Sequence, residues 1–315
     1  MRNILYKGFV IDPSVELVPS ITISPFSLSF DTISITTQMN GGGLSETVGR
    51  DYKLFPKCRS AIHAAISYYT LQPDDVVSIF TTSGNTYISS CVTKIIEKTC
   101  KWSMQIEEKT KVIFVNHEFG YPYQNIEELK KYKLPIIEDA AHAFFTKDEN
   151  IGKVGDFVVY SLPKAFPMQL GGILTSPKGF DCNIGETASK AVENYIKVNF
   201  SNASKRMLNT VKKRIDNYFY LKEKLDSLGI EPYFSDSKIN ANAIVPSVFL
   251  FKWHDDMDYP KLKSFMQSNG VESSVFYGRN AFYIPCNDSL CKRELDYMIA
   301  LLEYFYLENY ENNKR

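Results

Sequence analysis

The chain has 315 residues, enough for one large domain with a sizeable core or for one large and one small domain. Apolar residues make up 44% and charged residues 23%, as in an ordinary globular protein. Lysine plus arginine and aspartate plus glutamate number 36 each, so the charge gives no case for nucleic acid or an anionic membrane as a partner. A few local cations could still hold an anionic small molecule.

The sequence predicts no export signal, no membrane span and no zinc site. The first residues, "MRNILYKGFVIDP", lack a long apolar stretch, and no apolar run reaches the roughly 18 residues that cross a bilayer. The six cysteines show no paired metal-ligand spacing. We therefore expect reduced thiols and a cytoplasmic protein.

The periodic pattern sharpens after about residue 50. The residues before it are rich in Ser, Thr and Gly, and "MNGGGLSETVG" is typical of a flexible loop. "CRSAIHAAISYYT" then has its apolar residues at helical spacing, and "VVSIF" (76–80) predicts a short strand. In "TTSGNTYISSCVTKIIEKT" apolar residues again mark one helix face, and the small polar residues Ser83, Gly84 and Asn85 suit a helix start.

Four later runs are continuously apolar, and they read "KVIFVN", "LPII", "DFVVY" and "GGILTS". Continuous rather than alternating runs predict strands that are buried on both faces. A short helical stretch, "NIEELKKYK", separates the first two. We therefore predict an α/β fold with a large, mixed, mostly parallel sheet that helices cover on each side.

The pattern of predicted elements changes after about residue 180, where helices and strands in mixed order predict a smaller α+β domain. A long basic helical segment covers roughly 203–229, strand and helix patterns follow it, and the last helix is predicted from Asp288. The predicted organisation is an N-terminal segment (1–50) that packs on the rest, a large α/β domain (51–185) and a small C-terminal α+β domain (186–315).

Polar side chains follow the predicted strands at their carboxyl ends. His117 comes after "KVIFVN", Asp139 after "LPIIE", and Ser161 with Lys164 after "DFVVY". Ligands of open α/β sheets bind just beyond these ends. A deprotonated lysine forms a Schiff base with an aldehyde. A buried carboxylate needs a partner such as a protonated pyridine nitrogen. Together these residues point to pyridoxal 5′-phosphate (PLP), whose phosphate suits a helix N-terminus.

The stretch "LPIIEDAAHAFFTKDENIGKVGDFVVYSLPKAFPMQLGGILTS" resembles the cofactor core of the DegT/StrS family of PLP-dependent nucleotide-sugar aminotransferases. That family has the fold-type-I aspartate aminotransferase architecture. Its motif runs Asp-x-Ala-Gln/His, a "G…G-D" segment, Ser, Lys and a Gly-Gly pair. The matching residues are Asp139, Ala141, His142, Gly155, Asp156, Ser161, Lys164, Gly171 and Gly172. The likeness covers roughly residues 50–310 and is specific over 135–175.

The resemblance implies a role for each matched residue. Lys164 would hold PLP covalently and shuttle the substrate proton, and Asp139 would pair with the pyridine nitrogen. His142 would lie near the ring oxygen. Ser161 would contact the phosphate.

Further cofactor contacts are expected from two predicted helix starts. The backbone amides around Arg59 and Ser60 would help Ser161 to hold the phosphate, and residues 83–85 could lie beside the cofactor. Three residues are candidates for substrate contact: His117, Glu118 and Tyr277. For His117 a structural place in a loop is the competing interpretation.

The implied reaction moves an amino group from an amino acid, glutamate by default, to a keto group of a nucleotide-linked deoxy sugar, for surface polysaccharide or amino-sugar biosynthesis. The resemblance also implies a homodimer with the active site at the interface.

Alternative functions are a PLP- or PMP-dependent sugar dehydratase, in which the lysine is replaced, and a ligand-binding member without catalysis. Two departures from the family bear on this choice. Ser161 and Lys164 are three residues apart where five is usual, and "KCRSA" replaces a Ser-Gly-Thr turn.

Overall fold

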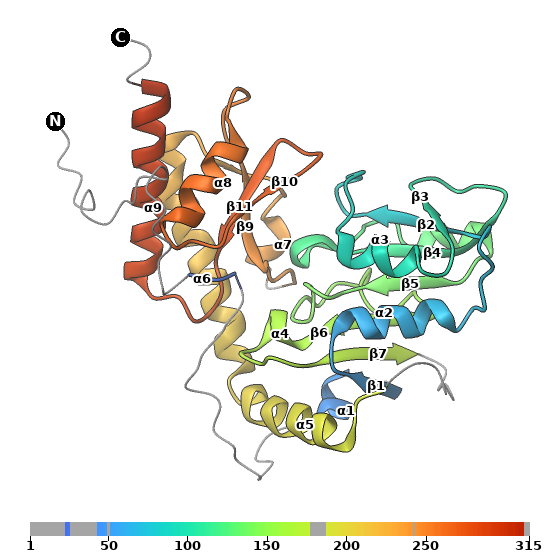
Figure 1. Ribbon diagram of the computed structural model, residues 1–315. Helices are drawn as coiled ribbons and strands as arrows, with labels where there is room; N and C mark the ends of the chain where they lie inside the picture. Colours follow the sequence, from blue (N-terminus) through green and yellow to red (C-terminus); the bar gives the residue numbers. More distant parts are fainter. Residues whose placement is uncertain (1–22, 26–42, 49–50, 177–186, 242, 312–315) are drawn as a thin grey trace. The chain divides into compact units, whose positions relative to one another are not determined.

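The computed structural model describes residues 23–25, 43–48, 51–176, 187–241 and 243–311 (Figure 1). The chain divides into two compact units. The small unit comprises Met1–Phe26, Thr210–Asn240 and Pro246–Arg315, and the large unit comprises Ser27–Asn209 and Ala241–Val245. The change of unit after Asn209 comes later than the predicted boundary at residue 185, because helix α5 (Lys190–Ser204) packs with strand β1 (Asp51–Phe55) of the large unit.

The large unit is built on a seven-stranded sheet with the order β1-β7-β6-β5-β4-β2-β3. Strands β2 to β6 pair in parallel, and β7 runs antiparallel to both β6 and β1. The strands are β1 (Asp51–Phe55), β2 (Val76–Thr81), β3 (Lys101–Ser103), β4 (Thr110–Asn116), β5 (Ile136–Asp139), β6 (Phe157–Ser161) and β7 (Gly172–Ser176). The predicted large, mixed, mostly parallel sheet is confirmed.

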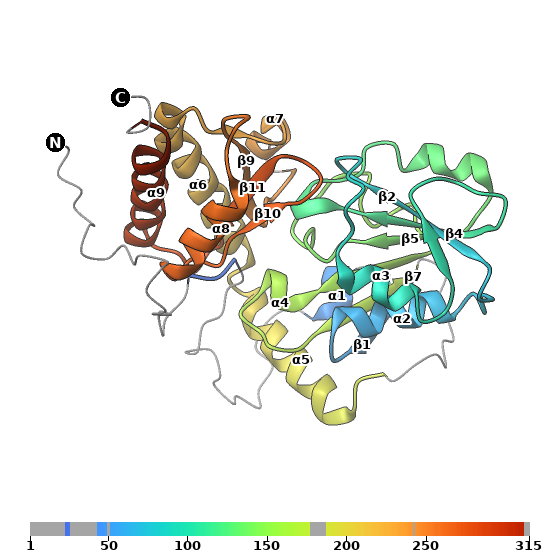
Figure 2. The ribbon, with the colours of Figure 1, turned by 45° about the horizontal axis from the view of Figure 1, so that its top comes forward.

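Helices cover both faces of this sheet, which explains the continuous apolar runs. In β4, Val112 and Phe114 join the core that α2 and α3 form on one face, where Figure 2 shows both helices. Ile113 and Val115 alternate with them and pack on the other face with Leu129 of η3. The helices of the large unit are α1 (Leu44–Val48), α2 (Cys58–Ser67), α3 (Ser90–Ile96), η2 (Glu118–Gly120), η3 (Glu127–Tyr132), α4 (Leu162–Ala165) and α5.

Two predicted boundaries in the large unit are wrong. Helix α3 begins at Ser90 rather than at residues 83–85, because the Ser89 hydroxyl caps it by accepting the Cys91 N–H. Residues 83–85 form a turn in which Asn85 Oδ1 accepts the N–H of Tyr87. The predicted loop "MNGGGLSETVG" contains helix α1, and its first residues lie outside the described part of the chain.

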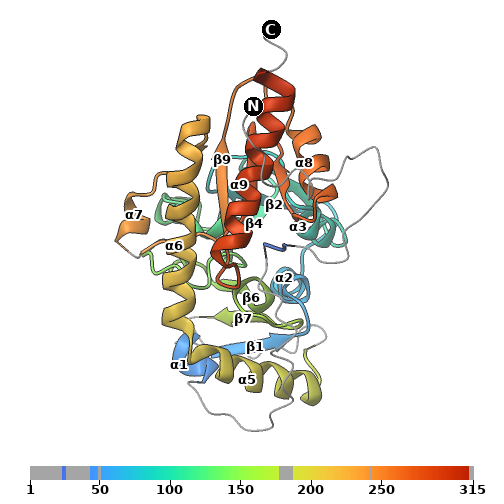
Figure 3. The ribbon, with the colours of Figure 1, turned by 90° about the vertical axis from the view of Figure 1, so that its left-hand side faces the viewer.

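The small unit holds a four-stranded antiparallel sheet with the order β10-β11-β9-β8. Tyr218 of α6 packs on Phe249 of β9, and Figure 3 shows these elements together with α8 and α9. The elements are α6 (Met207–Leu225), η4 (Asp226–Leu228), β8 (Glu231–Pro232), α7 (Ser237–Asn240), β9 (Val248–Lys252), α8 (Tyr259–Ser268), β10 (Ser274–Phe276), β11 (Ala281–Pro285), α9 (Lys292–Tyr306) and η5 (Leu307–Glu311). The predicted α+β composition is confirmed.

Helix α9 begins four residues after the predicted Asp288. The Asp288 carboxylate is engaged by Thr210 and by the buried Arg214 of α6. The helix is instead capped at Cys291, whose N–H donates to Glu294. Across all described residues, we find no helix with the length and apolar character to cross a membrane.

The Gly171–Gly172 pair brings strand β7 against the turn that opens α2. Gly171 has a φ of 138°, which L side chains rarely adopt, and its N–H donates to the Pro56 carbonyl at 3.0 Å. A Cβ on Gly172 would lie 2.5 Å from the Lys57 carbonyl oxygen and 2.7 Å from the Cys58 nitrogen. The absence of both side chains therefore sets how closely β7 approaches the first turn of α2.

We expect Gly172→Ala to lower the free energy of unfolding by about 1–3 kcal/mol, because the added methyl group meets backbone atoms that cannot rotate away. Urea denaturation measures the change. Gly43→Ala is the matched control, since a Cβ there meets nothing within 4 Å, and it should shift stability by less than about 0.5 kcal/mol. Equal effects of the two substitutions would contradict the close approach.

Candidate functional site

A cavity of about 380 Å³ lies in the large unit where three neighbouring strands end. Asn116, Asp139 and Ser161 are the last residues of β4, β5 and β6, and Asn116 and Asp139 are partners in the strand register. Of the polar residues predicted to converge at the carboxyl ends, Asp139, Ser161 and Lys164 line this cavity and His117 does not. The lining residues are Pro56, Lys57, Cys58, Arg59, Ile62, Ser89, Cys91, Val92, Asn116, Asp139, Ala141, His142, Ser161, Pro163, Lys164 and Gln169.

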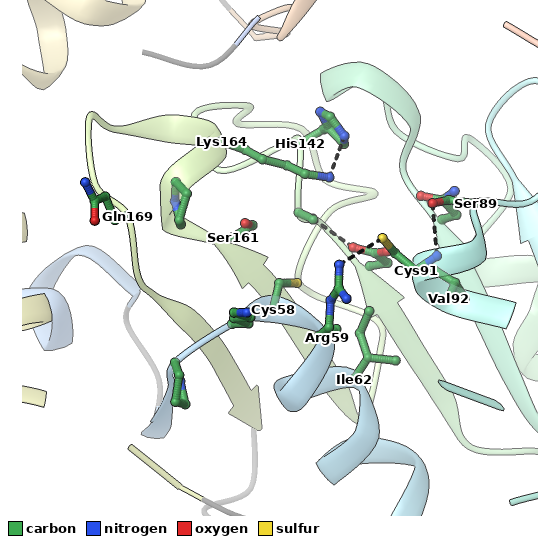
Figure 4. Close-up of a pocket in the computed structure, with 16 residues that line it drawn as sticks. Cys58, Arg59, Ile62, Ser89, Cys91, Val92, His142, Ser161, Lys164 and Gln169 are labelled. Carbon is green, nitrogen blue, oxygen red and sulfur yellow. Dashed lines mark hydrogen bonds between the residues drawn. The ribbon is translucent and has the colours of Figure 1, made fainter. Parts of the chain in front are cut away.

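Lys164 reaches the cavity although its loop is short. The residues after Ser161 form the single helical turn α4, which includes Lys164. Figure 4 shows the lysine side chain extending toward His142, and its Nζ lies 2.6 Å from His142 Nε2. Two basic nitrogens at this separation share one proton in a hydrogen bond, which either the lysine amine or the imidazole can donate. The spacing of three residues keeps both Ser161 and Lys164 in the lining.

Asp139 is a buried carboxylate with one oxygen left for a ligand. It is 6% exposed, and its Oδ1 accepts the Ala141 N–H at 3.0 Å. Burial raises the pKa of this carboxyl group, and the Lys164 charge and the Ala141 N–H partly oppose that rise. Within the described residues, the second carboxylate oxygen has no hydrogen-bond partner. A ligand N–H at this place would relieve an unfavourable burial.

Cationic side chains outnumber carboxylates in the lining. The lining contains three cationic side chains, Lys57, Arg59 and Lys164, and one carboxylate, Asp139. This balance of charge favours an anionic ligand. In the part of the chain that the structure describes, the Arg59 guanidinium makes one hydrogen bond, from Nη2 to Cys91 Sγ at 3.4 Å. Because sulfur is a weak acceptor, most of the guanidinium donors remain available to an anion.

The Cys58 thiol lies beside these charges at the start of α2. Burial raises its pKa, and the Asp139 carboxylate adds to that rise. Lys164 and Arg59 act in the opposite direction, so both cations are close to this sulfur. Cys58 therefore lies near Asp139 at the end of β5 and near Lys164 in α4.

His117 is buried behind β5 and does not line the cavity. Its Nδ1 accepts the Tyr123 N–H at 3.1 Å, so its Nε2 carries the proton and donates to Glu138 at 3.0 Å. Glu138 also accepts backbone N–H groups of Gly152, Val154 and Gly155. Burial acts to raise the pKa of this carboxyl group, but the His117 and backbone hydrogen bonds outweigh it and hold the pKa below its usual range.

The other predicted site residues also lie outside the cavity lining. Ser60 follows Arg59 in α2, and its N–H donates to the Lys57 carbonyl at 3.0 Å. Glu118 accepts the Ser83 N–H at 2.7 Å, which ties the turn of residues 83–85 (Ser83, Gly84 and Asn85) to η2. Tyr277 belongs to the small unit, where Lys263 Nζ donates to its hydroxyl at 3.4 Å.

Polar lining residues that the sequence interpretation missed come from four places. Asn116 ends an apolar run, and that position was a usable signal. Lys57 and Cys58 lie in the turn that replaces the usual small residues. Ser89 and Cys91 lie at the start of α3, which the sequence interpretation placed too early. Gln169 lies in the loop before β7.

Residues 47–221 match a family described as "Putative PLP-dependent aminotransferase". No curated protein matches the chain. The aminotransferase TlmJ of Streptoalloteichus hindustanus is 14% identical, with a TM-score of 0.66 over 82% of this chain and 87% of that one. A DegT DnrJ EryC1 StrS aminotransferase of Brucella abortus is 12% identical, with a TM-score of 0.65 over 83% and 88%. The PLP form of "Putative sugar aminotransferase Spr1654" of Streptococcus pneumoniae is 14% identical, with a TM-score of 0.67 over 90% and 97%. The predicted fold-type-I architecture is confirmed.

The residues in the cavity fit PLP, the cofactor of that family. PLP presents an aldehyde, a pyridine nitrogen and a phosphate. Lys164 offers a primary amine, and Asp139 offers a carboxylate oxygen that no described residue hydrogen-bonds. Lys57 and Arg59 add two cations. The volume lies within the range of about 300–1,000 Å³ that small-molecule sites occupy. Each chemical group of PLP therefore has a matching partner in the lining.

We expect Asp139→Asn to stabilise the cofactor-free protein at neutral pH. The folded-state pKa of Asp139 is raised, so its contribution to stability is present in acid, below the unfolded value, and is lost as the pH rises through the folded value. Thermal unfolding without PLP should show a higher midpoint for the variant at pH 7 and no difference near pH 4. Its affinity for PLP should fall at least about tenfold, because the partner of the pyridine nitrogen is removed.

Glu138→Gln is the contrasting control on the same strand. The pKa of Glu138 is lowered in the folded state, so its contribution is present above the unfolded value and is lost as the pH falls through the folded value. This variant should lose about 1.5–3 kcal/mol at pH 7, and the loss should shrink in acid. If Asp139→Asn destabilised the cofactor-free protein as Glu138→Gln does, the unpaired burial of Asp139 would be disproved.

Proposed function

Because the chain belongs to a family of PLP-dependent aminotransferases, we propose that it transfers an amino group from an amino acid to a keto group of a nucleotide-linked deoxy sugar. Glutamate is the proposed donor, and the product is an amino sugar for surface polysaccharide or related biosynthesis. Support comes from the DegT/StrS-like motif around Lys164 and from the fold shared with the Brucella aminotransferase and Spr1654.

The observation that carries the proposal is the placement of Lys164 and Asp139 in one cavity with a surplus of cations. When bound, PLP supplies an electrophilic aldehyde and an electron-withdrawing ring. Lys164 would be its attachment point, and Nζ would accept the substrate α-proton and return it. Asp139 would hold a proton on the pyridine nitrogen through its second carboxylate oxygen.

The remaining lining residues would orient the reactants. His142 Nε2, 2.6 Å from Lys164 Nζ, would hold the lysine amine in position and take up or supply its proton. Arg59, Lys57 and Ser161 would bind the phosphate through charge and hydrogen bonds. The proposed site leaves out the predicted site residues that do not line the cavity. These are Ser60, the turn of residues 83–85, His117, Glu118 and Tyr277.

Two alternative functions have less support. A PLP- or PMP-dependent sugar dehydratase would not need Lys164, yet the amine reaches the cavity beside His142. A ligand-binding member without catalysis would have no need of the lysine and carboxylate together. We also propose that the protein is a homodimer whose partner subunit completes the substrate pocket. Light scattering that gives the mass of a single chain would refute this last point.

We expect PLP to attach to Lys164 and to no other lysine. After incubation with PLP and reduction with borohydride, mass spectrometry should locate the modification on the tryptic peptide that contains Lys164. Lys164→Ala should lose the modification and at least about 100-fold of the transaminase activity. Lys57→Ala is the matched control, because Lys57 is the other lysine in the lining, and it should still be modified at Lys164. Modification of Lys57 in the wild type would contradict the assignment.

We expect nucleotide-linked keto sugars to be preferred over simple keto acids. The holoenzyme with glutamate should form 2-oxoglutarate when a nucleotide-linked 4-keto-6-deoxyhexose is added. The value of kcat/KM should be at least about tenfold lower for the same sugar without its nucleotide and for pyruvate. Aspartate and alanine in place of glutamate test the donor. Equal rates with pyruvate would refute the sugar assignment and leave the PLP attachment untouched.

A further inference from the structure

We propose that Phe119 is a positioning residue for Lys164, because its ring packs on His142 and holds the imidazole where it meets the lysine amine. The centroids of the Phe119 and His142 rings are 5.6 Å apart, and the ring planes are tilted by 55°. Nε2 of the same imidazole lies 2.6 Å from Lys164 Nζ, the contact drawn in Figure 4. The inference rests on the proposed role of Lys164 as the attachment point of PLP.

The backbone at Phe119 has a conformation that large side chains rarely adopt. Its φ of 53° and ψ of 25° lie in the left-handed region, where glycine and asparagine are much more common. The next residue, Gly120, also has a positive φ, of 96°. The turn itself therefore does not require an aromatic residue at position 119, and strained positions of this kind cluster at functional sites. The contact of the ring with His142 accounts for a phenylalanine here.

Hydrogen bonds on both sides of Phe119 hold this strained turn in place. The Thr82 hydroxyl accepts the Glu118 N–H at 3.0 Å and donates to the Tyr121 carbonyl at 2.8 Å. One side chain that directly follows β2 thus fixes the backbone before and after Phe119. The phenylalanine ring therefore leaves the chain in a fixed direction.

The turn is also tied to the segment that carries His142. Thr146 follows His142 in that segment, and its buried hydroxyl donates to the Gly120 carbonyl at 2.8 Å. The backbones that carry the two rings are therefore linked by a hydrogen bond adjacent to Phe119. Tilted aromatic rings with centroids about 4.5–7 Å apart attract each other, so the contact favours one orientation of the imidazole.

Phe119 acts on Lys164 through His142 rather than by touching a ligand. It is half-buried and does not line the cavity, whereas His142 and Lys164 both do. A lysine side chain loses much conformational entropy when its amine is held in one place. An imidazole that the Phe119 ring already orients offers this amine a fixed partner, so Nζ stays within reach of a ligand in the cavity.

The rate at which PLP attaches to Lys164 tests this role. With borohydride quenching at successive times, mass spectrometry should show attachment at least about tenfold slower in Phe119→Asn than in the wild type, because asparagine tolerates the left-handed backbone but has no such ring. Phe119→Gly is a second variant without the ring and should behave alike. Thermal unfolding shows that each variant is folded. Phe119→Tyr keeps the ring and should retain the wild-type rate. Wild-type rates in both ring-free variants would overturn the proposal.

A matched control separates the ring from the change of backbone propensity. Lys133 has the same left-handed conformation, with a φ of 55° and a ψ of 30°, and it is exposed at the end of η3. Lys133→Asn should leave the rate of PLP attachment unchanged. Equal slowing in Lys133→Asn and Phe119→Asn would contradict a specific role of the ring.

Combination with His142→Ala shows whether Phe119 works through the imidazole. His142→Ala should itself slow the attachment of PLP. Adding Phe119→Asn should then slow it no further, because residues that act through one contact are not additive. If the two effects multiplied, Phe119 would act by another route and the proposal would be wrong.

NMR spectroscopy of the cofactor-free protein tests the contact without PLP. The chain has four histidines, so the signal that is lost in His142→Ala identifies the His142 Nε2 resonance. This resonance should shift in Lys164→Ala, which removes its partner, and in Phe119→Asn, but not in Phe119→Tyr. An unshifted resonance in Phe119→Asn would overturn the proposal. If the wild type attached no PLP at Lys164 while the resonance shifted as expected, the Lys164 assignment would fail and the ring contact would stand.

Discussion

Strand β5 ends in two buried carboxylates that point to opposite faces of the sheet, and the cavity depends on the difference between them. Glu138 is surrounded by donors from His117 and from three backbone amides, so its charge is stabilised without a ligand. Asp139 accepts one N–H and faces the cavity. Since successive side chains of a strand alternate, a one-residue shift of β5 would exchange these two environments. The register of β5 therefore decides which carboxylate meets a ligand.

Glu138 also fixes that register. Its oxygens accept N–H groups from the loop of residues 152–155, so β5 is tied to the segment that leads into β6. His117 connects the same carboxylate to the chain that follows β4. The hydrogen bonds behind the sheet thus hold the ends of β4, β5 and β6 together, and these ends supply the floor of the cavity. Among the described residues, Glu138 accepts four hydrogen bonds, whereas Asp139 accepts one and leaves an oxygen for a ligand.

The sequence predicted the sheet and the convergence of residues because both follow from local patterns. Continuous apolar runs reveal doubly buried strands, and Asp139, Ser161 and Lys164 follow such runs directly. The hydrogen bonds that Glu138 accepts could not be predicted in this way, because the donors include backbone amides 14 to 17 residues further along the chain. The start of α3 was misplaced because Ser83 and Ser89 are equally good caps by composition, and only the turn around Asn85 distinguishes them.

In the proposed site, the turn "KCRSA" would change how the phosphate is held at the start of α2. Small residues would leave the amides alone to bind it, whereas here Lys57 and Arg59 add charge and Cys58 adds a thiol. Close packing of Gly172 against Lys57 and Cys58 keeps this turn in place despite the larger side chains. Charged groups bind a phosphate more strongly than neutral ones, but their attraction falls with salt. The same substitution brings a guanidinium to a second thiol, at Cys91. The two cations beside the proposed phosphate site and the guanidinium at Cys91 therefore both come from one short segment.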